Sequence, residues 1–87
     1  MKIEDTLSQR AATHGQFKTH AKLAVAMRDA FTDNAVSELD ESQIEALTMI
    51  FHKIARIGNG NPNYHDHWHD IAGYATLVAN ELLESTK

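Results

Sequence analysis

The clearest structural signal in the chain lies at residues 40–58, which read DESQIEALTMIFHKIARIG. Apolar side chains recur there every three or four residues, as on one face of an α-helix. Asp40 and Gln43 stand where the two side chains of a capping box belong, so we expect the helix to begin at Glu41. Gly58 is expected to end it after Ile57, because glycine adopts left-handed backbone geometry easily. The predicted apolar face holds Leu47, Ile50, Phe51, Ile54 and Ile57.

Helical patterns continue on both sides of this segment. GNGNPN at residues 58–63 is the one stretch that Gly, Pro and Asn mark clearly as a loop. Further helices are expected over about 64–84, about 16–32 and, more weakly, about 3–12. Because the sequence shows no sustained period-two alternation, the predicted fold is all-α, with three to four helices in an antiparallel bundle. The residues expected in its core are Trp68, Ile71, Ala75, Val78 and Leu82 in the last helix, with Phe17, Met27 and Phe31 upstream.

The length and composition indicate one small domain, residues 1–87. A chain of this size buries only roughly three-fifths of the surface that it exposes when unfolded. It has no Cys, so neither disulfides nor thiolate metal sites can stabilise a small core, and we expect a homo-oligomer to complete the bundle. No apolar run approaches the roughly 20 residues that span a bilayer, and the first residues are too acidic for a leader peptide. These features predict a cytoplasmic protein without a membrane partner.

The charge distribution argues against one class of partner. The net charge is −4, whereas general nucleic-acid binders present a basic surface. Residues 29–45 contain six acidic residues and no basic one, and residues 1–28 contain five of the eight Lys and Arg. This asymmetry favours head-to-tail contacts or a small anionic ligand over a nucleic-acid duplex. His14, Lys18 and Lys22 form one basic stripe that could reach such an anion or could be a solvated flank.

A second group of candidate residues lies on the helix expected over 41–57. At about 100° per residue, Glu45, His52 and Arg56 share a stripe that faces away from the apolar side, with Lys53 beside it. Arg56 and Lys53 could bind phosphate oxygens, because a guanidinium offers a rigid fork of donors and an ammonium a compact charge. The alternative is an ordinary solvated helix face.

The segment HDHWHD at residues 65–70 concentrates the histidines His65, His67 and His69. Asp66 and Asp70 are four residues apart and could hold Mg²⁺ together with water and substrate phosphates. His65 and His69 have the same spacing and could bind Zn²⁺ or Ni²⁺ as two nitrogen ligands. The third interpretation is structural, since acidic residues in a first helical turn complement the helix dipole.

The next residues extend the face that carries the two aspartates. Gly73 and Tyr74 follow on that face, and a glycine inside a helix suggests close approach of another helix or a ligand. Because the loop at 58–63 is short, the two helices that it joins are expected to be antiparallel neighbours. That arrangement predicts one cluster formed by Lys53, Arg56, Asp66 and Asp70.

Two segments together carry a family resemblance. HKIARI at residues 52–57, followed by DHWHDIAGYA at 66–75, resembles a family of small phage and prophage proteins of unknown function. That family is similar, at a distance, to the MazG-like all-α nucleoside triphosphate pyrophosphohydrolases. The shared pattern is Lys-x-x-Arg, a Gly/Pro loop and Asp-x-x-x-Asp-x-x-Gly-Tyr. The resemblance covers residues 43–82 and is faint over 10–31, where Thr13-His14-Gly15-Gln16 replaces the Tyr-Gly-Asp of relatives.

The resemblance implies a MazG-like bundle, a nucleotide as ligand and, for phage-encoded relatives, a bacterial host cytoplasm. MazG-like enzymes hold Mg²⁺ with a Glu-x-x-Glu pair and a Glu-x-x-Asp pair, and Asp66-x-x-x-Asp70 replaces the second pair here. The protein could therefore hydrolyse a nucleoside triphosphate to the monophosphate and pyrophosphate, or sequester a signalling nucleotide, such as a host defence signal, without turnover. A third possibility is a structural or partner-binding module whose charged residues form salt bridges across an oligomer. The residues implied for the ligand site are His52, Lys53, Arg56, Asp66, Asp70 and Tyr74, and those for Mg²⁺ are Glu45, Asp66 and Asp70.

Overall fold

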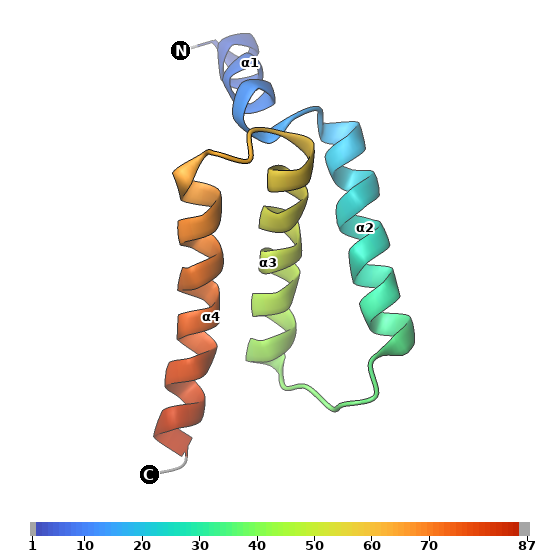
Figure 1. Ribbon diagram of the computed structural model, residues 1–87, viewed down its shortest axis with the longest axis vertical. Coiled ribbons are helices and arrows are strands. Elements are labelled where there is room, and N and C mark those ends of the chain that lie inside the picture. Colours follow the sequence, from blue (N-terminus) through green and yellow to red (C-terminus); the bar gives the residue numbers. More distant parts are fainter. Residues whose placement is uncertain (1, 86–87) are drawn as a thin grey trace.

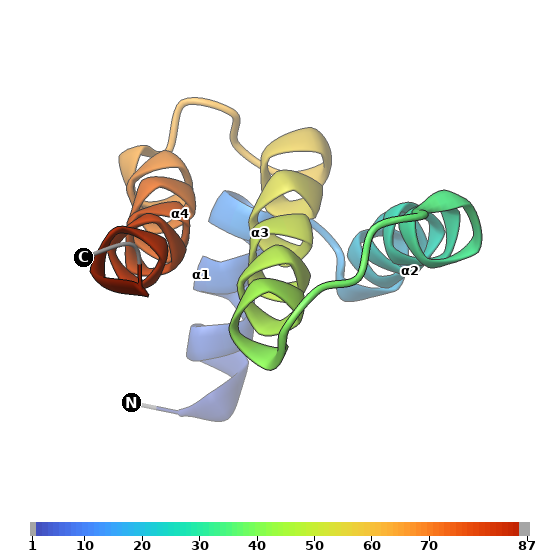
Figure 2. The same ribbon diagram turned by 90° about the horizontal axis from the view of Figure 1, so that it is seen from below.

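The computed structural model describes residues 2–85, and within that range it contains four helices and no strands. They are α1 (Ile3–His14), α2 (Phe17–Asn34), α3 (Glu41–Asn59) and α4 (His65–Ser85). The last three stand side by side in one antiparallel layer with α3 in the middle, and α1 packs at one end against α2 and α3 (Figures 1 and 2). The all-α prediction is confirmed. None of the helices in residues 2–85 has the length and apolar character needed to cross a bilayer.

The start of α3 follows the prediction, and its end does not. Asp40 Oδ1 accepts a hydrogen bond from the Gln43 amide at 2.8 Å, and Gln43 Oε1 accepts one from the Asp40 amide at 3.0 Å. This capping box fixes the first turn. The predicted stop at Gly58 is wrong, because the helix continues to Asn59. A Cβ at Gly58 would lie 3.2 Å from Leu23 Cδ2, so this glycine instead lets α2 approach closely.

The corners at one end of the layer are joined by hydrogen bonds. The side-chain amide of Asn59 donates to the carbonyl oxygens of His14 at 3.3 Å and Gln16 at 2.9 Å. The backbone amide of Asn61 donates to Thr13 O at 3.0 Å. The loop between α3 and α4 therefore holds the bend between α1 and α2 (Figure 1).

Glycines make this close contact possible. Gly15 has φ +81°, and a Cβ there would overlap the backbone carbonyl of Asn59. Gly60 faces the backbone of residues 13–14 in the same way, with the nearest atoms 2.5 Å from a Cβ built on it. Gly73 differs, because a Cβ there would meet nothing within 4 Å. The close approach predicted at Gly73 is thus not made within the described chain.

The apolar core of the single chain is small. The only apolar residues that are buried among those described are alanines: Ala24, Ala46 and Ala55. The prediction that Phe17 is a core residue is wrong, because this first residue of α2 follows the bend and is 81% exposed. Phe31 does pack against Phe51, with ring centroids 5.8 Å apart, although Phe31 itself stays 36% exposed. A single layer of helices covers only the sides of each helix, so the stripe predicted for the core of α4 lies largely open, with Trp68 55% and Leu82 48% exposed.

Candidate functional site

The structure brings together two of the four charged residues expected to cluster. Lys53 Nζ lies 2.9 Å from Asp70 Oδ2, and the exposed fractions of the two side chains are 11% and 40%. The antiparallel packing of α3 on α4 produces this contact. The hydrogen bond from Lys53 lowers the pKa of Asp70 below its ordinary value. The buried lysine and its carboxylate therefore satisfy one another.

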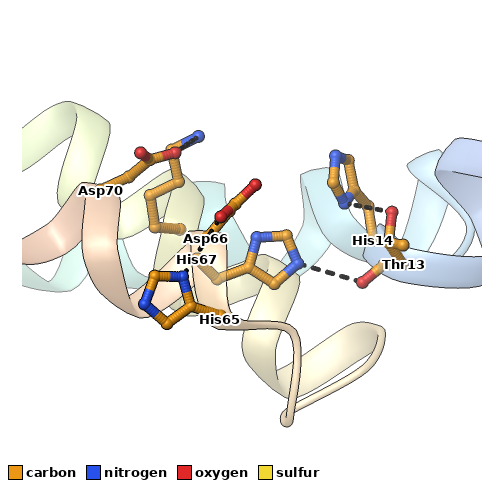
Figure 3. Close-up of polar contacts among 7 residues, drawn as sticks. Thr13, His14, His65, Asp66, His67 and Asp70 are labelled. Carbon is orange, nitrogen blue, oxygen red and sulfur yellow. Dashed lines mark hydrogen bonds and ion pairs between the residues drawn. The ribbon is translucent and has the colours of Figure 1, made fainter.

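The other predicted residues lie elsewhere around this pair. Asp66 contacts the neighbouring His65 ring, with Oδ1 and Nδ1 3.3 Å apart, and both side chains are exposed (Figure 3). Arg56 borders a cavity at the bend between α1 and α2. Glu45 is exposed on α3, and Tyr74 is half-buried on α4. Of the four charged residues, Lys53 and Asp70 therefore form an ion pair with each other, and Arg56 and Asp66 take no part in it.

The three carboxylates expected to hold Mg²⁺, Glu45, Asp66 and Asp70, have different surroundings in the structure. Within residues 2–85 no group of three or more His, Asp or Glu side chains could hold a metal ion. Of the three expected ligands, Asp70 is already engaged by Lys53. His65 and His69 do lie side by side, with stacked rings 5.5 Å apart. The magnesium and zinc sites stay predictions.

His67 differs from its two neighbouring histidines because it is only 1% exposed. A carbonyl oxygen only accepts, so His67 Nε2 carries a proton and donates it to Thr13 O at 3.0 Å (Figure 3). The ring also packs against His14 and Tyr64, with centroids 4.8 and 4.9 Å away. His67 therefore attaches α4 to the end of α1. The sequence signal for this role is the spacing of His67 from Asp70. His67 stands three residues before Asp70, on the side of α4 that faces α3.

A basic cavity of about 380 Å³ lies at the bend between α1 and α2. None of the described residues that line it is acidic. Among the described residues, none forms an ion pair with Arg56, which is half-buried. The cavity therefore places two arginines together with no carboxylate among its described lining residues. The carboxylate that Arg56 influences is Asp70, whose pKa is lowered by the hydrogen bond from Lys53 and, to a smaller extent, by the charge of Arg56. Its lining consists of Leu7, Arg10, Ala11, His14, Gly15, Gln16, Phe17, His20 and Arg56.

His20 is the buried polar group of this cavity. It is 6% exposed, its Nε2 lies 3.3 Å from His52 Nδ1, and its buried Nδ1 has no hydrogen-bond partner. The ring stacks against His52 at 5.5 Å and Phe17 at 6.0 Å. Burial, then the charges of Arg56 and His52, lower the pKa of His20. Burial and Arg56 also lower the pKa of His14.

The basic stripe predicted along His14, Lys18 and Lys22 is broken by the bend. His14 ends α1 and lines the cavity, whereas Lys18 and Lys22 lie together on a separate surface of α2. Sequence reasoning missed Arg10 and His20 as members of the site. His20 lies three residues after Phe17 and four before the buried Ala24, and a histidine at that phase of an apolar face was the available signal.

These two histidines predict how stability depends on pH. Their pKa values are lowered from about 6.5, so between that pH and the folded-state values the unfolded chain binds protons that the folded chain does not. The contribution of these two histidines to the free energy of unfolding is fully present above about pH 6.5, and it is lost as the pH falls through this window. The lowered pKa of Asp70 acts separately, since its contribution disappears only in strong acid, below about pH 3.9.

Urea unfolding at about pH 7.5 and about pH 5.5 measures the effect. The midpoint is expected to fall at the lower pH, and the fall should shrink in His20→Gln. Equal midpoints for the unsubstituted protein at both pH values would contradict the prediction.

The fold and the cavity define a small all-α protein with a basic site where two helix corners meet. Residues 3–82 match a domain of unknown function, DUF6378, and the chain belongs to this family. No curated protein and no solved structure matches the chain.

Proposed function

We propose that this protein binds a phosphorylated small molecule, and more specifically a nucleotide, in the basic cavity at the bend between α1 and α2. The observation that carries the proposal is the lining of that cavity. Arg10, Arg56, His14 and His20 contribute to it, and no described lining residue is acidic. An anion there would offset the charges of Arg10 and Arg56, and it would favour the protonated forms of His14 and His20.

Arg56 is the residue best suited to hold a phosphate. A guanidinium donates in a planar fork that matches two phosphate oxygens, and no described residue forms an ion pair with it. Its charge lowers the pKa of both His14 and His20, so it lies within electrostatic reach of both. Lys53 also lowers the pKa of His14, but it does not line the cavity and its charge is paired with Asp70. His52 does not line the cavity, but its Nδ1 lies 3.3 Å from Nε2 of His20, which does.

Two further features favour a nucleotide over inorganic phosphate. The ring of Phe17 lines the same cavity and is 81% exposed, so that a flat base could stack on it. The volume of about 380 Å³ lies within the range of sites that hold small organic ligands, roughly 300–1,000 Å³. We therefore place the phosphate near Arg56 and the base near Phe17.

Sequestration and hydrolysis are both versions of this proposal. The resemblance to MazG-like enzymes supports conversion of a nucleoside triphosphate to the monophosphate and pyrophosphate. The direct contact between Lys53 and Asp70 supports binding without turnover, since it occupies one of the few carboxylates nearby. We propose sequestration of a signalling nucleotide, as a phage-type protein would perform it, and the assay below separates the two.

The test titrates the protein with nucleoside mono-, di- and triphosphates and with pyrophosphate, with and without Mg²⁺, and measures binding heat and pyrophosphate release separately. Arg56→Gln is expected to weaken binding about tenfold or more, which corresponds to about 1.4 kcal/mol. Phe17→Ala should weaken nucleotides but not pyrophosphate. Arg28→Gln is the matched control, because Arg28 lies on α2 outside this cavity. The proposal fails if Arg56→Gln leaves the affinity for every phosphorylated compound unchanged.

A second candidate is a structural module without a ligand. The Lys53–Asp70 pair supports it, because it joins α3 to α4 with nothing between the two groups. In that case no nucleotide in the panel would raise the melting temperature, whereas a ligand that binds the folded state must raise it.

A further inference from the structure

One face of the helical layer contains an apolar groove of about 750 Å³. It runs from the end of α2 and the link at 35–39 across α3 to α4. The only charged residue among the described residues that line it is Glu38. Its apolar lining includes Phe31, Leu39, Leu47, Ile50, Ala75 and Val78.

This groove contains apolar positions that helical periodicity assigns to a core. Leu47 and Ile50 belong to the apolar face of α3, and Ala75 and Val78 to that of α4. Val36, in the link, is 98% exposed in the single chain. Contiguous apolar surface of this kind marks a site of association.

We propose that a second copy of this chain covers the groove, with the two layers packed face to face about a twofold axis. This proposal does not depend on the nucleotide site, which lies at the bend between α1 and α2.

The small core argues for a permanent cover. The buried apolar residues among those described are only three alanines, and a chain of 87 residues without Cys has no disulfide to compensate. If the fold needs its apolar groove covered, the partner that covers it must be present whenever the chain is present. A second copy meets this condition because it is made together with the first.

Charge and size suit self-association. A twofold axis places the same surface of both copies in contact, so a face rich in one charge would repel itself. This groove contains a single charged side chain, Glu38, among its described lining residues. The other five acidic residues of segment 29–45 do not line it, so the charge asymmetry does not require a head-to-tail contact here. The molecule measures 48 × 28 × 22 Å, so its broad face can supply the about 800 Å² per partner of a standard interface.

The test measures mass in solution by light scattering and sedimentation. We expect a dimer at about 100 µM and its dissociation on dilution, because association follows mass action. Ile50→Glu, which places a charge in the groove, is expected to weaken dimerisation about tenfold or more. Leu77→Glu is the control. Leu77 is exposed, does not line the groove and lies about 200° around α4 from Ala75.

A monomer at about 100 µM would overturn the proposal and leave the groove to a different protein. So would a dimer whose mass and melting temperature Ile50→Glu leaves unchanged.

A second measurement applies even if Ile50→Glu does not fold. Because the chain has no Cys, Ile50→Cys introduces a single thiol. In the dimer this thiol should react with a disulfide reagent about tenfold or more slowly than after dilution to the monomer, because only the exposed thiolate attacks. The thiol of Leu77→Cys should react at the same rate at both concentrations, and a rate for Ile50→Cys that does not change on dilution would overturn the proposal.

Discussion

Gly15→Ala is expected to lower the free energy of unfolding by about 3 kcal/mol or more. Gly15 has φ +81° and ψ −173°, a backbone conformation that is essentially restricted to glycine. The added methyl group would also overlap the backbone carbonyl of Asn59. That carbonyl cannot move away freely, because the side chain of Asn59 is bonded to both His14 and Gln16. Urea unfolding followed by circular dichroism measures the loss.

Gly73→Ala is the matched control, since it makes the same chemical change inside α4. A Cβ at Gly73 meets nothing within 4 Å, and alanine favours a helix over glycine by about 0.5–1 kcal/mol. We expect this variant to be slightly more stable than the unsubstituted protein. If Gly15→Ala and Gly73→Ala unfold at the same urea concentration, the close contact between the two corners is not what holds α1 in place.

The helices of this fold could be predicted because they are local features. The spacing of apolar residues predicted α2, α3 and α4 to within a few residues, and the capping box predicted the start of α3. The short loop at 58–63 correctly predicted that Lys53 lies beside Asp70. The end of α3 was not predictable from Gly58, because the same residue serves close packing against Leu23 instead of a change of direction.

The contact between the α1–α2 bend and the end of α3 with its following loop could not be predicted, because its partners are far apart in the sequence. Asn59 and His14 are separated by 45 positions, and nothing in the local pattern around either residue indicates the other. The cavity depends on this contact, since its lining comes from α1, the bend, α2 and α3. Arg56 was identified from its residue type and spacing, whereas the groups around it depend on how the corners meet.

Periodicity also has a limit in the core. It correctly identifies the apolar sides of α3 and α4, but it does not say which element covers them. The core predicted for α4 is the clearest case, since Trp68 stays half-exposed and instead donates a hydrogen bond from its indole nitrogen to Pro62 O at 2.8 Å. The pattern therefore identifies the apolar side of each helix without identifying what, if anything, covers it.

His67→Ala is expected to lower the free energy of unfolding by about 2–4 kcal/mol. His67 is almost completely buried, and its removal leaves a cavity beside His14 and Tyr64. The variant also removes the hydrogen bond from His67 Nε2 to Thr13 O, the attachment of α4 to α1. Thr13 O keeps its bond from the Asn61 amide, so the loss should come mainly from packing.

His69→Ala is the control, because His69 lies two residues away in the same helix, is exposed and, among the described residues, stacks only on His65. A substitution at such a surface position should change stability by about 0.5 kcal/mol or less. The pair of variants also decides between two interpretations of the HDHWHD segment. If His65 and His69 held a metal, His69→Ala would abolish a rise in melting temperature caused by Zn²⁺ or Ni²⁺, and His67→Ala would not. If the segment is structural, neither metal raises the melting temperature and only His67→Ala destabilises the fold. The burial of His67 alone among the three histidines supports the structural interpretation.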